Sequence, residues 1–480
     1  MDGEEFKRHG HALVDWIANY LDHPERYPVL AQVHPGDVRA ALPPAAPDQP
    51  QPFEEIFADF ERVLLPALTH WNHPGFFAYF AISSSPVAVL AEFLAAALNQ
   101  QAMLWRTSPA ATELEEVSLA WLRQLLGLPD TFEGVIYDTA SVSTLHGLAA
   151  AREAAIDGVR QRGLAARSDL APPRVYCSEH AHSSVEKAII LLGLGQDALR
   201  RIPADDDHVM RVDVLEDAID RDRAEGALPL AIVATLGTTS TTSCDPVQRI
   251  ADVCARTDIW LHVDAAYAGV AAMLPDQRHW FAGWERADSV VVNPHKWLFV
   301  PVDLSAFYCR RMDVVRRAFS LVPDYLMTPD AERGARNLMD TGIQLGRRFR
   351  ALKLWMVLRE FGTTGIQDVL TRHIHLAREF AAWVDAHPAF ERLAPVPFSV
   401  VCFHARPHGV GEGQLDALNE HLLTDVNASG EVFLSHTRLN GRLVLRLAIG
   451  NLRTTEQHVC RAWELLQQAL SHHSGGVLPR

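Results

Sequence analysis

A lysine stands directly after a predicted buried strand, in the segment Asn293-Pro294-His295-Lys296-Trp297. The β-branched run over 289–292 predicts the strand, and Pro294 ends it because proline has no N–H to donate. A lysine amine that is partly shielded from water can lose its proton and attack a carbonyl carbon. On this segment alone, a surface lysine after a strand is an equally good interpretation.

Two other predicted strands end at residues that suit the same chemistry. The strand over 230–235 runs into a hydroxyl-rich turn at 237–242, and the strand over 259–263 runs into Asp264. Because ligands of α/β sheets bind outside the carboxyl ends of the strands, we expect these residues to lie near Lys296. Together, the three strand ends indicate one site more strongly than any of them does alone.

Two helix starts that follow strands offer further candidate contacts. Ala140 and Ser141 open a helix after the strand over 134–137, where N–H groups and the helix dipole favour an anion. A plain N-cap is the alternative interpretation of these two residues. His182 lies in a second helix start at 178–185, where it could stack on a planar ligand or simply belong to a capped helix.

These residues match what pyridoxal phosphate requires of a protein. The cofactor needs a lysine for its aldehyde, a carboxylate facing the pyridine nitrogen, a phosphate cup and a flat group against the ring. The chain supplies them, in that order, as Lys296, Asp264, Ala140-Ser141 and His182. The chain between Asp264 and Lys296 is long enough for one crossover helix between neighbouring strands.

The elements that must position these residues alternate from residue 134 onwards. Strands followed by helices predict an α/β fold in which helices cover a sheet. A proline-rich connector at 42–52 and a long loop at 320–340 interrupt the regular pattern, and a long helix is predicted from 346 to 360. Further helices are predicted at 4–21, 53–65, 86–102 and 109–128.

The composition is that of a soluble globular enzyme. Of 480 residues, 48% are hydrophobic and 21% charged, and the net charge of -15 argues against nucleic acid or an anionic membrane as partner. The start shows no signal peptide, and the six scattered cysteines without a CxxC pair favour a reducing, cytoplasmic location. The histidines are dispersed without an HExxH motif, so we expect no metal site.

The chain resembles the group II pyridoxal-phosphate decarboxylases, and most closely the aromatic-L-amino-acid decarboxylase family. The resemblance runs from Glu5 to about Leu466. It rests on the segments THW (69–71), FFAYF (76–80), SPAATELE (108–115), AHSS (181–184), ATLGTT (234–239), HVDAAYAG (262–269), NPHKW (293–297) and LGRRFR (345–350).

The resemblance implies a role for each matching residue. Lys296 is the expected Schiff-base lysine, Asp264 the partner of the pyridine nitrogen, and His182 the residue stacked on the ring. Tyr325, in a mobile loop, is expected to protonate the carbon that loses CO2. The other implied cofactor contacts are Ala140, Ser141, Thr239, Ala266, Asn293 and His295. The implied substrate contacts are Trp71, Tyr79, Phe80, Ile82, Met103 and Gly346.

The fold implied is of the aspartate-aminotransferase type, also called PLP fold type I. We expect a large α/β domain at 84–370 with a mostly parallel mixed sheet, and a small C-terminal α+β domain at 371–480. An N-terminal helical segment at 1–83 is expected to wrap over the partner subunit of a homodimer whose active site lies at the interface.

The implied reaction is decarboxylation of tryptophan, tyrosine, phenylalanine or dihydroxyphenylalanine to the amine and CO2. The first alternative is an aldehyde synthase that adds oxidative deamination. Relatives with phenylalanine at the position of Tyr325 tend to be such synthases, so tyrosine favours amine formation. A decarboxylase of non-aromatic amino acids and a catalytically silent binding homologue are further alternatives.

Several residues depart from the family pattern. Asp138 brings a negative charge close to the expected phosphate site, unless it points away or caps the helix. Ile82 and Met103 replace a smaller polar residue and an aromatic one, which alters the shape of the expected pocket. Gly346 is small, which favours a bulky aromatic substrate, while Arg106 lies close in sequence to pocket residues.

Overall fold

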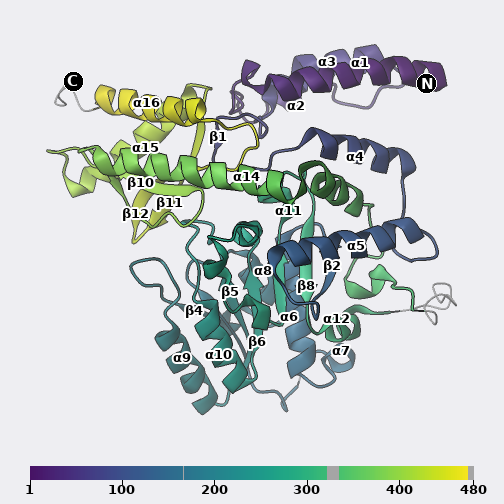
Figure 1. Cartoon of the computed structure of the whole chain (residues 1–480), viewed down its shortest axis with the longest axis vertical. Coiled ribbons are helices and arrows are strands. Elements are labelled where there is room, and N and C mark those ends of the chain that lie inside the picture. The colour runs from purple at the N-terminus through teal and green to yellow at the C-terminus, as the bar shows by residue number, and fades with distance from the viewer. Residues whose placement is uncertain (166, 322–333, 474–480) are drawn as a thin grey trace. The chain divides into compact units, whose positions relative to one another are not determined.

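The computed structural model describes residues 1–165, 167–321 and 334–473, and the chain divides into two compact units (Figure 1). The first unit comprises Met1–Ala81, Arg378–Leu393 and Val401–Arg480. The second unit comprises Ile82–Ala377 and Ala394–Val400. Within the described residues, no helix is both long and apolar enough to cross a membrane.

The second unit is built on a seven-stranded sheet of order β2-β8-β7-β6-β5-β3-β4. The strand β8 is antiparallel to both of its neighbours, and the other neighbouring strands run parallel. The predicted mostly parallel mixed sheet is therefore confirmed. The bounds are β2 (Glu133–Tyr137), β3 (Pro173–Ser178), β4 (Leu199–Ile202), β5 (Leu228–Thr235), β6 (Trp260–Asp264), β7 (Ser289–Val292) and β8 (Ser305–Cys309).

Helices on both sides bury this sheet. Every residue of β6 and β7 is buried, as expected for central parallel strands covered on two faces. Figure 1 shows two groups of helices flanking the strands, and within each group the helices contact one another. One group is α6 (Ala140–Ala155), α8 (Ser184–Leu191) and α12 (Met312–Phe319), and the other is α9 (Val212–Ala224) and α10 (Val247–Thr257).

Three longer helices have bounds that differ from the predicted ones. The helix α4 (Pro86–Leu98) ends earlier than predicted, because Asn99 takes the left-handed conformation with φ 45°. The helix α5 (Pro109–Leu126) ends at Gly127, which also has positive φ. The helix predicted over 346–360 is instead α14 (Ala351–Ala386), which continues through a break at Gly362.

The first unit contains a five-stranded sheet of order β1-β11-β12-β10-β9. Its short strand β1 (Phe76–Phe77) pairs in parallel with β11 (Phe433–Leu439), so the N-terminal part of the chain extends a C-terminal sheet. The other strands are β9 (Phe390–Arg392), β10 (Val400–Ala405) and β12 (Arg442–Ala448). The unit's helices are α1 (Gly3–Asp22), α2 (Asp37–Ala41), α3 (Phe53–Asp59), α15 (Glu412–Ala428) and α16 (Glu456–His473).

Candidate active site

The carboxyl ends of β5, β6 and β7 form one edge of the large sheet. Thr235, Asp264 and Val291 are aligned across the three strands. The backbone N–H of Leu236 donates to the carbonyl of Asp264 at 2.8 Å, and that of Asn293 donates to Ala266 at 3.0 Å. The predicted meeting of the hydroxyl-rich turn, the carboxylate and the lysine segment at this edge is thereby explained by strand register.

Lys296 lies on the single helical turn α11 (Pro294–Trp297), which begins directly after β7. Both of its neighbours in the chain are held in place. His295 is buried, and the buried ring of Trp297 stacks on Tyr267 at 4.8 Å with an interplanar angle of 6°. The indole N–H of Trp297 also donates to Nδ1 of His373 at 3.0 Å. The lysine is therefore presented by a rigid segment, as a nucleophile requires.

Lys296, Asp264 and His182 influence one another electrostatically. Burial lowers the pKa of Lys296, and the negative charge of Asp264 partly opposes this shift. Burial also lowers the pKa of His182, which Asp264 raises and Lys296 lowers. The structure therefore brings together the three side chains that were predicted to act on one ring, with the lysine biased toward its nucleophilic, neutral form.

The carboxylate of Asp264 is fixed by its own turn. It is 5% exposed, and its Oδ1 accepts the backbone N–H of Ala266 at 3.0 Å. Its second oxygen, Oδ2, can accept the N–H of a protonated pyridine ring, which needs a nearby negative charge to keep its proton.

The predicted phosphate contacts Ala140 and Ser141 form the first two residues of α6. Thr139 precedes them as N-cap, but its side chain does not cap the helix. Instead, the hydroxyl and the backbone N–H of Thr139 both donate to Oδ1 of Asp138, at 3.1 Å and 2.6 Å. Asp138 thus binds the residue ahead of the helix, and the first N–H groups of α6 remain suited to an anion.

His295 and Asn293, which follow β7, offer a hydrogen-bond donor and an acceptor next to Lys296. Nδ1 of His295 accepts the backbone N–H of Leu304 at 2.9 Å, so the neutral ring carries its proton on Nε2. Burial, together with the nearby charge of Lys296, lowers the pKa of His295 to about 3. Among the described residues, no hydrogen bond satisfies the buried Oδ1 of Asn293. A buried polar atom without a partner is expected where a ligand completes the site.

The structure also reveals a supporting residue that the sequence did not indicate. Asp245 is fully enclosed, and its two oxygens accept the backbone N–H groups of Thr235 at 2.8 Å and Met210 at 2.9 Å. Burial raises its pKa to about 6. It holds the end of β5 beside Asp264, whereas the predicted contact Thr239 lies exposed in the turn that follows.

Three of the predicted substrate contacts lie in the first unit. Trp71 stacks on Phe76 at 4.3 Å and on Tyr79 at 6.0 Å. Tyr79 is 53% exposed and has φ 50°, a conformation rarely adopted by a residue with a side chain. Arg446, which sequence analysis missed, donates to the carbonyl of Tyr79 at 3.2 Å and places its guanidinium 5.4 Å from the ring of Phe80.

The other three predicted substrate contacts, Ile82, Met103 and Gly346, lie in the second unit. A Cβ at Gly346 would lie 3.3 Å from Nε2 of Gln101, so a larger residue there would press on that side chain. That all six residues line one substrate pocket stays a prediction.

Tyr325 lies outside the described residues. Within the described part of the chain, no group of three or more His, Cys, Asp and Glu side chains could hold a metal ion. The candidate site consists of a partly buried lysine, a fixed carboxylate, an imidazole and a helix start suited to an anion, which together fit pyridoxal phosphate.

The chain is similar to known proteins over nearly its whole length. Residues 35–406 match the model of the pyridoxal-dependent decarboxylase conserved domain. The chain is 40% identical to the aromatic-L-amino-acid decarboxylase of Sus scrofa, over 97% of this chain and 96% of that protein. It is 39% identical to phenylacetaldehyde synthase of Arabidopsis thaliana, over 98% and 97%. The crystal structure of Oryza sativa TDC with PLP and tryptamine superposes with a TM-score of 0.94 at 35% identity, over 98% of this chain and 99% of that one.

Proposed function

The chain belongs to the pyridoxal-dependent decarboxylases and is a PLP-dependent carboxy-lyase, and from that premise we propose that it decarboxylates an aromatic L-amino acid to the amine and CO2. The observation that carries this proposal is the joint placement of Lys296 and Asp264 at neighbouring strand ends, where their charges interact. Tryptophan, tyrosine, phenylalanine and dihydroxyphenylalanine are the proposed substrates.

Each proposed role follows from the chemistry of the side chain. When bound, PLP supplies an aldehyde for the lysine and a ring that accepts the electrons of the broken bond to the carboxylate. Lys296 acts as the nucleophile because its burial favours the neutral amine. Asp264 would keep a proton on the ring nitrogen, and His182 would pack against the ring. The N–H groups at the start of α6 and the Nε2–H of His295 would hold the phosphate.

An aldehyde synthase would differ from a decarboxylase in what happens to the carbon that loses CO2. We assign proton delivery to this carbon to the phenol of Tyr325, on the basis of the family resemblance. The similarity to phenylacetaldehyde synthase keeps oxidative deamination as the second candidate function. Replacement of Tyr325 by phenylalanine should therefore raise the ratio of aldehyde to amine.

We further propose a homodimer that works in the cytoplasm. The helix α4 presents four exposed apolar side chains on one face, Leu90, Phe93, Leu94 and Leu98, at a spacing that places them side by side. An exposed apolar face of this kind is suited to a second copy of the chain. All six cysteines are free, which suits a reducing compartment.

Product analysis tests the proposal. The holoenzyme is incubated separately with the four aromatic amino acids, and CO2, amine, aldehyde and peroxide are measured. We expect equal amounts of amine and CO2 without peroxide. Aldehyde with stoichiometric peroxide would show an aldehyde synthase instead, and the absence of any turnover with bound cofactor would point to non-aromatic substrates or to a silent homologue.

A further inference from the structure

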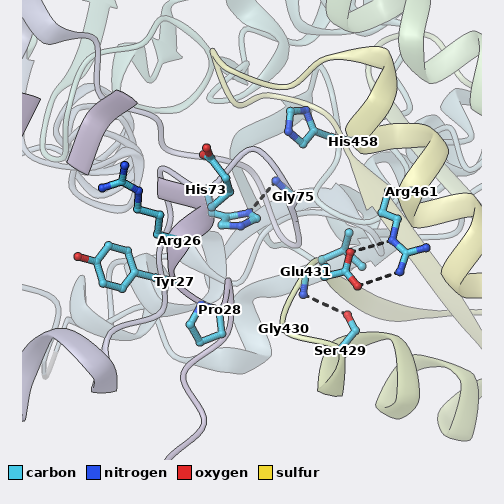
Figure 2. A pocket seen from close by; sticks show the side chains of 12 residues that line it. Arg26, Tyr27, Pro28, His73, Gly75, Ser429, Gly430, Glu431, His458 and Arg461 are labelled. Carbon is cyan, nitrogen blue, oxygen red and sulfur yellow. Dashed lines mark hydrogen bonds and ion pairs between the residues drawn. The ribbon is translucent and has the colours of Figure 1, made fainter. Parts of the chain in front are cut away.

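A cavity with both polar and apolar walls lies wholly within the first unit and contains none of the cofactor-site residues named above. Its volume of about 330 Å³ suits a small molecule. In Figure 2, the segment Arg26–Pro28 lies on one side of the cavity and the ion pair of Glu431 with Arg461 on the other. The walls come from residues 25–28 and 429–432, from His73 and Gly75, and from His458 and Arg461 of α16.

Backbone hydrogen bonds fix these walls. The N–H of Val29 donates to the carbonyl of Gly430 at 2.8 Å, and that of Phe433 donates to Gly75 at 3.0 Å. A Cβ at Gly75 would come within 2.2 Å of the carbonyl oxygen of Glu431, so only glycine permits this close approach. The cavity is therefore preformed by the packing of distant segments.

Two histidines offer hydrogen-bond donors in this cavity. Nδ1 of His73 accepts the N–H of Gly75 at 2.9 Å, and Nδ1 of His458 accepts the N–H of Thr455 at 3.1 Å. A backbone N–H can only donate, so each neutral ring carries its proton on Nε2. Within the described residues, no hydrogen bond uses either Nε2, although His73 is only 4% exposed.

Burial keeps both rings neutral at physiological pH. It lowers the pKa of His73 to about 4, and it also lowers the pKa of His458. His458 adds to the lowering of the pKa of His73, while the carboxylate of Glu25 opposes the shift in both histidines. Two N–H donors and one carboxylate that line the same cavity give it both donor and acceptor groups.

The remaining walls carry both signs of charge and an apolar surface. Arg461 donates to both oxygens of Glu431, at 2.8 Å and 2.9 Å, so this pair is nearly neutral. A purely anionic ligand would meet Glu25 and Glu431, and a purely cationic one would leave the imidazole N–H groups unsatisfied. Tyr27 and Pro28 offer an apolar surface beside these groups.

We propose that this cavity binds a free α-amino acid with an apolar side chain, as a second site outside the cofactor centre. The carboxylate accepts from Nε2 of His73 and of His458, the ammonium group pairs with Glu25, and the side chain lies against Tyr27 and Pro28. The chemistry of the cavity alone gives this ligand class. That the ligand is also the enzyme's own substrate, which would make the cavity a regulatory site, rests on the proposed function.

Calorimetry on a blocked active site tests the proposal. The holoenzyme is treated with borohydride, which locks the cofactor on its lysine, and is titrated with L-phenylalanine, phenethylamine or 3-phenylpropionate. We expect one equivalent of phenylalanine to bind. The amine and the acid should each bind at least about tenfold more weakly, because each lacks one charge-assisted hydrogen-bonding group.

Variants locate the binding to this cavity. His458→Phe removes one carboxylate donor and Glu25→Gln removes the partner of the ammonium group, so each should weaken phenylalanine binding at least about tenfold. His472→Phe, an exposed substitution on the same helix α16, should bind as the unaltered enzyme does. The Glu25 side chain is exposed, so its replacement also serves as the variant that is expected to fold normally.

Three results would overturn the proposal. These are the absence of phenylalanine binding, equal binding by His458→Phe and the unaltered protein, and equally tight binding of 3-phenylpropionate, which would indicate a simple anion site. Turnover is measured before reduction in the same preparation. A failure of the decarboxylase proposal therefore appears as missing amine and CO2, independently of the binding heat.

Discussion

Asp264 has two effects that a single substitution can separate. Its charge holds up the pKa of Lys296 against burial, and its carboxylate is the proposed partner of the ring nitrogen. In Asp264→Asn we expect turnover to fall by about 100-fold or more, the scale for loss of a preorganised charged group.

The same variant should shift a pH profile in a defined direction. Without the negative charge of Asp264, burial acts alone on Lys296, so its pKa falls further and more neutral amine is present at a given pH. The rate at which the apoenzyme takes up PLP should then reach half its maximum at a lower pH, as measured by absorbance. Asp264→Glu keeps the charge and should leave the midpoint in place. An unchanged midpoint in Asp264→Asn would contradict the assigned interaction.

The same residues show what sequence can predict about a site. Lys296 and Asp264 were identifiable because each comes after a predicted buried strand whose end is visible in the sequence. Asp245 was not identifiable, because its importance comes from the backbone groups of Thr235 and Met210 that it binds after folding. Arg446 was missed for the same reason, since its contact with Tyr79 joins residues far apart in the chain.

At the scale of elements, α4 and α14 are joined by a carboxylate with two different partners. Glu92 on α4 contacts Nζ of Lys353 at 2.5 Å and Nη2 of Arg348 at 2.9 Å. The lysine side chain is 1% exposed and the arginine 60%. Lys353 also donates to the carbonyl of Pro301 at 2.9 Å, which connects this pair to the segment that follows α11.

Removing the carboxylate should therefore destabilise the protein far more than removing its exposed partner. Glu92→Gln leaves a buried ammonium group without its counter-charge, which should cost about 3 kcal/mol. Arg348→Ala removes an exposed pair and should cost less than about 1 kcal/mol. Urea denaturation followed by tryptophan fluorescence compares the two. Equal midpoints for both variants would show that Lys353 does not depend on Glu92.

The loss in Glu92→Gln should also depend on pH. Burial already lowers the pKa of Lys353, and the hydrogen bond from Glu92 opposes this shift, so the substitution lowers the pKa further. Between the folded and the unfolded pKa, the unfolded state binds more protons, so stability rises with pH in that window. The difference in urea midpoint between Glu92→Gln and the unaltered protein should thus shrink as the pH rises above neutrality.

A strand or helix could be predicted where its sequence signal is local. The strand β7 was predicted with its observed bounds, because its β-branched run followed by Asn293-Pro294 is a local signal for a buried strand. The strand β1 was not predicted, since its two phenylalanines lie in an aromatic cluster and their pairing partner β11 is contributed by the far end of the chain. The pairing of distant segments is information that no local pattern carries.

At the scale of the whole molecule, the exposed face of α4 bears on assembly. The helix exposes Leu90, Phe93, Leu94 and Leu98, each by about half of its surface. Single exposed apolar residues are ordinary, whereas four on adjacent turns of one helix form a continuous patch. The same helix is fixed to the second unit through Glu92, so the patch is presented on a rigid element.

A charge placed in this patch should prevent the proposed homodimer. In Leu94→Glu, dimerisation would bury a carboxylate without a partner, at a cost of several kcal/mol, about 1,000-fold in the dissociation constant. We expect mass photometry to show a monomer for this variant and a dimer for the unaltered chain. Leu191→Glu, at an exposed leucine of α8, is the matched control and should remain dimeric. If Leu94→Glu remains dimeric as well, α4 does not form the interface. If it becomes monomeric but retains full turnover, the active site is complete within one chain, which would contradict the prediction that the site lies between subunits.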